Sequence, residues 1–254
     1  MRKNFNVAKE CKNIINWIKD YFKSQPNAHG AVIGISGGKD SFISAKLLVE
    51  ALGKERVFGV LMPNGEQKDI SDSLRIVNLL GIICKIVNIE KAYKGLIEAM
   101  EESSLSIDAK INIPPRLRMT TLYAVSASMH YRVCGTGNKS EGFVGYTTKW
   151  GDSAFDFNPI GDLTTEEVIA VGDYLGLPYE LVHKTPSDGL SGQSDEDKLG
   201  FSYEQINRFI ENGTCGNKDI DEKIKLKHEY NRHKGILPSK YEFNFNLTGK
   251  SANH

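Results

Sequence analysis

The sequence lacks long apolar runs, and none approaches the ~18 residues that a membrane-spanning helix requires. Charged residues interrupt the amino-terminal stretch MRKNFNVAKECKNIINWIKDYF, so we expect neither a signal peptide nor a membrane segment. An excess of one charge sign is also absent, because Lys plus Arg and Asp plus Glu each number 32. These absences argue against a membrane partner and against a broad nucleic-acid-binding surface.

Cysteine is sparse and widely spaced. Cys11, Cys84, Cys134 and Cys215 form no CxxC pair, which argues against a zinc site or a redox dithiol. The simplest inference is a reduced, cytoplasmic protein. With 254 residues, of which 40% are apolar and 25% charged, the chain is expected to form one domain spanning residues 1–254.

Apolar, strand-like runs alternate with helical patterns through the first half of the chain. An amphipathic helix is predicted over residues 6–24, to pack on the sheet or on a second subunit. The predicted strands are 31–35, 57–62, 82–89 and 131–134, and the predicted helices between them are 40–52, 70–80, 90–101 and 116–130. This alternation indicates an α/β fold, with a parallel sheet covered by helices on both faces.

The second half is read from its turn and capping signals. A glycine-rich loop is predicted over residues 135–162. Thr164 with Glu167, and later Ser202 with Gln205, have the spacing of capping boxes that begin helices. The polar segment KTPSDGLSGQSDEDKLG between them is long enough to be a functional loop.

A glycine-rich turn follows the first predicted strand and leads at once into a helix. The hexapeptide SGGKDS, residues 36–41, would bring backbone N–H groups and the positive end of a helix dipole to one point, which favours an anion. It is no Walker A loop, because Asp40 follows Lys39, and it is no GxGxxG fingerprint. Since Asp40 would repel phosphate unless a divalent cation lay between them, we expect Mg²⁺ here. The alternative is a tight turn without a ligand.

SGGxDS at the end of the first strand of an α/β sheet resembles the signature of the ATP pyrophosphatases, which have an adenine-nucleotide alpha-hydrolase-like, Rossmann-like fold. Those enzymes cleave ATP between the α and β phosphates and adenylate an oxygen of a second substrate. The resemblance implies that the loop holds the departing pyrophosphate and that Lys39 and Asp40 are catalytic. The ATP contacts that it implies here are Gly34, Ile35, Ser36, Gly37, Gly38, Lys39, Asp40 and Ser41.

Several later blocks narrow the class of enzyme. PPRLRM, GTGNKSE, GYTTKWGD, PIGDL, KTPSDGLSGQSDEDKLGFSY and HKGILP stand in the order typical of ammonia-dependent NAD⁺ synthetases, and the resemblance covers residues 10–240. It implies ATP-dependent amidation of deamido-NAD⁺ by ammonia, giving NAD⁺, AMP and pyrophosphate in the last step of NAD⁺ biosynthesis. It also implies a homodimer.

The same resemblance assigns individual residues. Asp40 and Glu141 would hold a Mg²⁺ ion that bridges ATP phosphates, and Thr136 and Ser187 would contact ATP. The residues implied to bind deamido-NAD⁺ are Arg116, Lys149, Asp156, His233 and Lys234.

These residues also have plainer interpretations. Glu141 alone would be a solvated loop acid, and Arg116 a surface arginine. Arg116 and Arg118 are expected at the start of a helix, where a cation opposes the dipole and so needs an anionic partner. At Thr165 many relatives carry a lysine that reaches the ATP phosphates, so we assign no such role to Thr165.

In the implied reaction the nicotinate carboxylate attacks the α-phosphorus of ATP, pyrophosphate leaves, and ammonia displaces AMP from the acyl-adenylate. A tRNA-thiolating or nucleobase-directed ATP pyrophosphatase is one alternative, although paired cysteines and a basic stripe are missing. A non-catalytic nucleotide sensor is another, but it would have no use for Glu141 or Lys149. None of the four cysteines fits the nucleophile of an amidase domain, so we expect ammonia rather than glutamine as donor.

Overall fold

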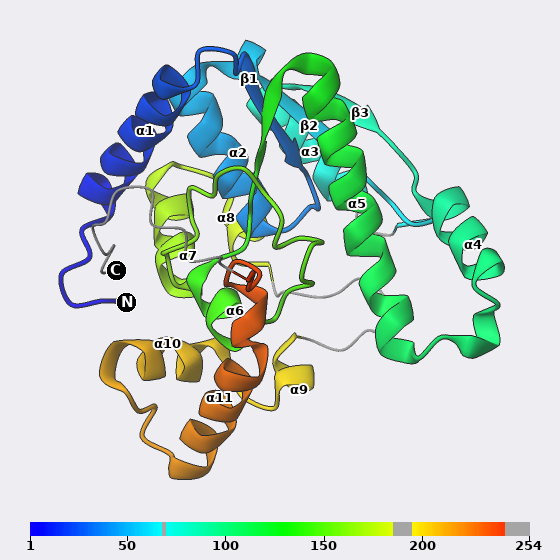
Figure 1. Cartoon of the computed structure of the whole chain (residues 1–254). Coiled ribbons are helices and arrows are strands. Elements are labelled where there is room, and N and C mark those ends of the chain that lie inside the picture. The colour runs from blue at the N-terminus through cyan, green and yellow to red at the C-terminus, as the bar shows by residue number, and fades with distance from the viewer. Residues whose placement is uncertain (68–69, 185–194, 242–254) are drawn as a thin grey trace, which may run out of the picture.

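The computed structural model describes residues 1–67, 70–184 and 195–241, and a parallel sheet of strand order β3-β2-β1-β4 lies at its centre (Figure 1). The strands are β1 Gly30–Gly34, β2 Val57–Leu61, β3 Ile83–Ile86 and β4 Tyr131–Cys134. The helices are α1 Val7–Ser24, α2 Lys39–Leu52, α3 Ile70–Leu80, α4 Glu90–Ala99, α5 Ile107–Met129, α6 Lys139–Val144, α7 Thr165–Tyr174, α8 Tyr179–Val182, α9 Asp195–Leu199, α10 Tyr203–Asn212 and α11 Lys218–Asn231. Short 3-10 turns cover Lys54–Arg56, Glu102–Ser104 and Arg232–Lys234.

The pleat of β1 divides its side chains between two apolar layers. Ala31 and Ile33 face the core that α1, α2 and α7 share, whereas Val32 faces the smaller core under α5. Ile33 pairs with Gly59 of β2 and Cys134 of β4, so the carboxyl ends of β1, β2 and β4 lie at one edge of the sheet. The predicted α/β fold with helices on both faces is confirmed.

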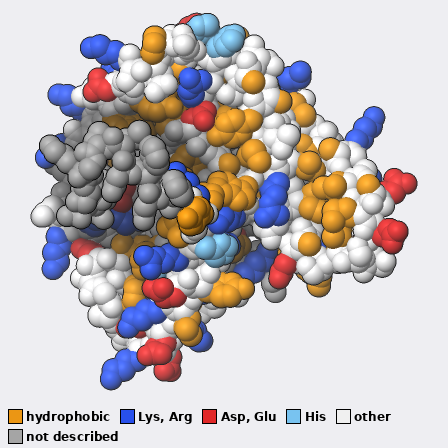
Figure 2. Space-filling model, viewed as in Figure 1, with side chains coloured by type: hydrophobic (Ala, Val, Ile, Leu, Met, Phe, Trp, Pro, Cys, Tyr) orange, Lys and Arg blue, Asp and Glu red, His pale blue; other side chains and the backbone are white. Residues whose placement is uncertain are grey.

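Helix α1 buries its apolar face within the chain. Cys11, Ile18 and Phe22 are buried against α2 and α7. The predicted partner was the sheet or a second subunit, but the helix packs on α2 and α7 of the same chain, so its buried face is not available to a second subunit. Exposed apolar side chains gather instead over α4 and α5 (Figure 2), where Ile107 is 77% and Ile111 57% exposed.

One predicted boundary in the middle of the chain is wrong. Helix α5 begins at Ile107 rather than at residue 116, because Ser106 caps it by accepting from Ala109 N at 3.2 Å. Pro114 lies buried inside the helix, which packs on β1 and β4. Arg116 therefore lies in mid-helix, and the argument from an opposing helix dipole does not apply to it.

The predicted loop over residues 135–162 contains the short helix α6. Asn138 caps it, and Glu141 lies in its first turn rather than in a solvated loop. Gly145 ends it with φ 65°, and a Cβ there would lie 2.1 Å from Cβ of Asn231, so only glycine fits. Both predicted capping boxes, at the starts of α7 and α10, are confirmed.

A second apolar cluster joins the carboxyl-terminal helices to α6. It contains Val144, Leu199, Phe201, Ile206 and Ile224, and in Figure 1 α9, α10 and α11 lie together beneath α6. In the part of the chain that the structure describes, every helix is too short or too polar to cross a lipid bilayer.

Candidate active site

The turn from β1 to α2 is closed by its own serines. Gly37 has φ 86°, a conformation that glycine adopts at little cost. Ser36 Oγ accepts from Gly38 N at 3.2 Å and lies 3.1 Å from Ser41 Oγ, which donates to Gly38 O at 3.0 Å. These bonds hold the turn so that the first N–H groups of α2, which have no intrahelical partner, end at the carboxyl edge of the sheet.

Two predicted metal ligands meet at this edge through one asparagine. Asn138 donates from Nδ2 to Asp40 Oδ1 at 3.3 Å and from its backbone N to Glu141 Oε2 at 3.0 Å. Lys39, only 6% exposed, donates to Asp40 Oδ2 at 3.0 Å. Asp40 from α2 and Glu141 from α6, which are 101 positions apart in the sequence, thus belong to one cluster.

The cluster carries more negative charge than its own cation balances. Burial, and then the charge of Asp40, raise the pKa of Glu141 to about 8. Burial alone would lower the pKa of Lys39, but Asp40 and Glu141 outweigh it, so that pKa lies above its usual value and the ammonium persists.

The donor set fits Mg²⁺, which usually binds one or two carboxylates together with substrate phosphates and water. Among the described residues no three His, Cys, Asp or Glu side chains are grouped to hold a metal ion by themselves. Asp40 and Glu141 would therefore supply two ligands and leave the remaining positions to other oxygens.

A pocket of about 480 Å³ opens beside the cluster. It lies between the starts of α2, α7 and α10, and the residues that line it include Lys39, Thr165, Lys184, Asp195, Tyr203 and Asn207. Thr165 donates to Asn138 Oδ1 at 3.4 Å, and its N–H donates to Ser140 Oγ at 3.0 Å. The pocket is thus continuous with the groups that hold the two carboxylates.

Four of the five predicted substrate-binding residues form a second cluster. Arg116 Nε donates to Lys149 O at 3.3 Å, and Lys149 Nζ donates to His233 O at 2.7 Å. Lys234 Nζ donates to the carbonyl oxygens of Gly145 and Thr147, each at 2.9 Å. Burial lowers the pKa of Lys234.

Helix α6 connects this cluster of Arg116, Lys149, His233 and Lys234 to the carboxylates. Glu141 lies in its first turn, and Gly145, whose carbonyl anchors Lys234, directly follows its last residue. The cationic cluster is therefore fixed to the same short helix as one of the proposed metal ligands.

Asp156, the fifth residue, lies apart from that cluster at β4. Its Oδ2 accepts from Val133 N at 2.7 Å and its Oδ1 from Tyr123 Oη at 3.2 Å. Its backbone N also donates to Val133 O at 2.9 Å. The structure thus shows this carboxylate holding the edge of the sheet and bringing α5 to it.

The sequence of the chain matches the NAD synthase family model over residues 10–240. The chain belongs to the NAD synthase family. The NH(3)-dependent NAD(+) synthetase of Carboxydothermus hydrogenoformans is 39% identical over 76% of this chain and 81% of its own length, and that of Archaeoglobus fulgidus is 38% identical over 92% and 96%. The solved NMN synthetase of Francisella tularensis has a TM-score of 0.87 and 33% identity, and covers 94% of this chain and 100% of its own. The predicted family resemblance is confirmed.

Of the predicted ATP-binding and metal-binding residues of this NAD synthase family member, Lys39, Asp40 and Glu141 lie in the carboxylate cluster, at the end of the loop of residues 34–41. Thr136 lies in the segment between β4 and α6. Ser187 lies outside the described residues. The ligand contacts of all these residues stay predictions.

Sequence reasoning missed Asn138, Tyr123 and Tyr203. The spacing of Asn138 and Glu141 is that of a capping box and could have revealed the helix start. No local pattern indicates that Asn138 also reaches Asp40, or that the hydroxyl of Tyr123 reaches Asp156, because both contacts join distant segments.

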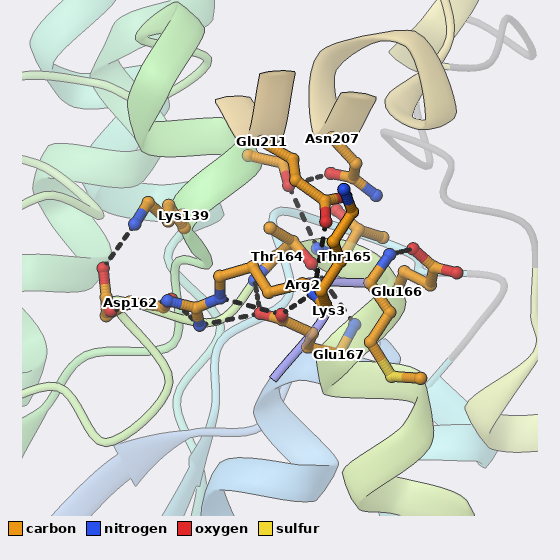
Figure 3. Close-up of polar contacts among 12 residues, drawn as sticks. Arg2, Lys3, Lys139, Asp162, Thr164, Thr165, Glu166, Glu167, Asn207 and Glu211 are labelled. Atoms are coloured by element: carbon orange, nitrogen blue, oxygen red, sulfur yellow. Dashed lines mark hydrogen bonds and ion pairs between the residues drawn. The ribbon is translucent and has the colours of Figure 1, made fainter. Parts of the chain in front are cut away.

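A third polar cluster fastens the amino-terminal segment to α7 (Figure 3). Arg2 donates from Nε to Glu167 Oε1 and from Nη2 to Glu167 Oε2, both at 2.8 Å. It also donates from Nη1 to Asp162 Oδ2 at 3.1 Å, and Lys139 Nζ donates to Asp162 Oδ1 at 2.7 Å. Arg2 thereby connects the start of α7 to the start of α6.

Proposed function

We propose that this protein is an ammonia-dependent NAD⁺ synthetase, a ligase that converts deamido-NAD⁺, ATP and ammonia into NAD⁺, AMP and pyrophosphate. One observation carries the proposal: the SGGKDS loop brings Asp40 beside Glu141, with Asn138 bonded to both. A nucleotide sensor would gain nothing from two carboxylates whose charge needs a cation. The free state of all four cysteines is consistent with a cytoplasmic enzyme without a disulfide framework.

The residues of the chain have separate tasks in this proposal. The loop of residues 34–41, with Thr136 and Ser187, binds ATP and receives the pyrophosphate when a nicotinate carboxylate oxygen attacks the α-phosphorus. Lys39 places positive charge next to the oxygens on which negative charge grows. Arg116, Lys149, Asp156, His233 and Lys234 hold deamido-NAD⁺. Ammonia then forms the amide bond and AMP leaves.

Asp40 and Glu141 would hold Mg²⁺, which when bound offsets the charge of the ATP phosphates. The raised pKa of Glu141 supports this assignment. Part of that rise comes from the negative charge of Asp40, and a cation bound between the two carboxylates would offset it. Asn138 keeps both carboxylates pointing toward the same space.

A second candidate function is amidation of nicotinate mononucleotide. The observation that favours it is the likeness to the Francisella tularensis NMN synthetase, at a TM-score of 0.87 over 94% of this chain. The chemistry at the carboxylate would be the same, and the two reactions differ only in whether the substrate carries an adenylate half.

The deciding experiment compares the two substrates in one assay. Purified protein receives ATP, Mg²⁺ and ammonium with either deamido-NAD⁺ or nicotinate mononucleotide, and pyrophosphate and the amide product are measured. We expect a higher kcat/KM for deamido-NAD⁺. A higher kcat/KM for the mononucleotide would replace the proposal with the second candidate. If neither substrate leads to release of pyrophosphate, both candidates are refuted.

The nitrogen donor is tested in the same assay. We expect the rate to rise with pH as the free-ammonia fraction grows. We also expect no amide product when glutamine is the only donor and contaminating ammonia has been removed. Efficient turnover with glutamine alone would contradict the proposed ammonia dependence.

We also propose a homodimer, supported by the exposed apolar side chains of α4 and α5 (Figure 2). Contiguous exposed apolar surface is typical of an interface. Ile107 and Ile111 are the most exposed apolar residues of α5. Sedimentation should give twice the 28.2 kDa of one chain, and Ile107→Glu with Ile111→Glu should shift it to the monomer. A monomeric wild-type enzyme with full activity would contradict the proposal.

A further inference from the structure

Tyr203 is a buried tyrosine whose hydroxyl makes no hydrogen bond within the described structure. It is the first residue of α10 and is 6% exposed, and its ring packs in the second apolar cluster. Its backbone N donates to Glu196 Oε1 at 2.7 Å, but its hydroxyl has no hydrogen-bond partner among the described residues. A buried phenol without a partner lowers the stability of the fold, and phenylalanine would fill the same space without that cost.

Tyr203 borders the proposed ligand pocket, and its hydroxyl is covered from solvent in this structure. Tyr203 lines the 480 Å³ pocket together with Lys39 and Thr165. Burial, followed by the charges of Glu141 and Asp195, raises the pKa of the phenol above its usual value, so the group keeps its proton and acts as a donor. Asp195 accepts at 3.0 Å from the hydroxyl of Tyr146 instead.

The charge around the pocket indicates which acceptor it receives. Lys39 and the amino-terminal end of α2 bring positive charge to its edge, whereas Glu166, Asp195, Glu196 and Glu204 also line it, so an anion would enter this pocket together with a cation. The two carboxylates nearby are those that would share a cation with phosphate. An oxygen of a polyphosphate is therefore the acceptor that suits both the lysine and the orphaned donor.

We propose that the hydroxyl of Tyr203 donates a hydrogen bond to a phosphoryl oxygen in the pyrophosphate half of ATP. The inference rests on the proposed function, because it places that half of ATP at the SGGKDS loop. Tyr203 is then a ligand-binding residue that the protein retains at a cost to its own stability.

The test is Tyr203→Phe, because one atom is removed and two effects of opposite sign are expected. The melting temperature of the ligand-free protein should stay equal or rise. The kcat/KM for ATP should fall about 10- to 100-fold, as expected when a hydrogen bond to a charged group is lost. Isothermal titration with pyrophosphate and Mg²⁺ should show weaker binding by a similar factor.

Two matched variants control for the loss of a tyrosine hydroxyl elsewhere in the fold. Tyr146→Phe removes a hydroxyl that already has a partner, so its melting temperature should fall. Tyr174→Phe changes an exposed tyrosine of α7 and should alter neither quantity.

An unchanged affinity for pyrophosphate in Tyr203→Phe would overturn the proposal, and so would a lower melting temperature, since that would show an internal partner. If wild-type protein forms no amide product, the proposed function fails. The pyrophosphate titration still decides the role of Tyr203 in that case, because it needs no turnover.

Discussion

Glu141 and Glu167 occupy the same position in their helices, but their pKa values are shifted in opposite directions. Each is the third residue of its helix and completes a capping box, with Asn138 in α6 and Thr164 in α7. Burial is the largest influence on both pKa values and would raise each. The pKa of Glu141 rises to about 8, whereas that of Glu167 falls below its usual value.

The difference comes from the residues that the fold brings to each carboxylate. Glu167 is 0% exposed, yet it accepts from the guanidinium and the backbone N of Arg2 and from Thr164 N. Glu141 accepts from Asn138 N and faces the like charge of Asp40. A buried carboxylate whose charge is fully balanced holds the fold together, and one whose charge is left over indicates a site for an external cation.

Asp40→Asn tests the unbalanced site most severely. It removes one negative charge without changing side-chain volume, so Mg²⁺ binding should weaken. We expect the amidation rate to fall about 100-fold or more. The melting temperature without metal should be unchanged or higher, because the repulsion with Glu141 is gone. Steady-state rates over a Mg²⁺ series and a thermal melt measure both, and normal activity at ordinary Mg²⁺ would rule out the metal role.

Asn138→Ser should give a smaller loss of activity. Serine keeps an N-cap acceptor for α6 but has no amide group to donate to Asp40 Oδ1. We expect the Mg²⁺ concentration at half-maximal rate to rise about tenfold, as when a partner of a metal ligand is removed. The rate at saturating Mg²⁺ should change much less. An equal fall at every Mg²⁺ concentration would mean that Asn138 acts elsewhere.

Arg2→Met should affect stability rather than chemistry. It leaves Glu167 buried without its cation, which should cost about 2–3 kcal/mol, below the range for a fully buried pair because the Arg2 side chain is 35% exposed. Urea denaturation measures the loss. Activity below the unfolding transition should stay within about twofold of wild type. Adding Glu167→Gln should restore part of the stability, and an additive loss would show that the two residues are not coupled.

The pH dependence of stability should differ in sign at the two carboxylates. Glu141 has its pKa raised from 4.5 to about 8, so the metal-free fold should lose stability as pH rises through that interval. Glu167 has a lowered pKa, so its contribution is lost on acidification below its usual range. Melting curves with chelator should show a shallower decline between pH 5 and 8 in Glu141→Gln than in wild type. Parallel curves would contradict the assignment.

Much of the frame of this protein is determined by local sequence. The short, near-continuous apolar runs predicted the strands near Gly30–Gly34 and Val57–Leu61, and Tyr131–Cys134 with the same bounds. Thr164 with Glu167, and Ser202 with Gln205, predicted the starts of α7 and α10, since a capping box needs only four consecutive residues. The SGGKDS turn likewise predicted an anion-binding loop from its own backbone chemistry.

Only the tertiary structure decided what surrounds each of these signals. Whether a capping glutamate lies beside Arg2 or beside Asp40 depends on segments more than 100 residues away. A local sequence pattern cannot predict such a contact. The partnerless hydroxyl of Tyr203 is visible only once a pocket has formed around it. Local patterns act through the backbone over a few residues, whereas charge balance and burial depend on which distant side chains the sheet brings together.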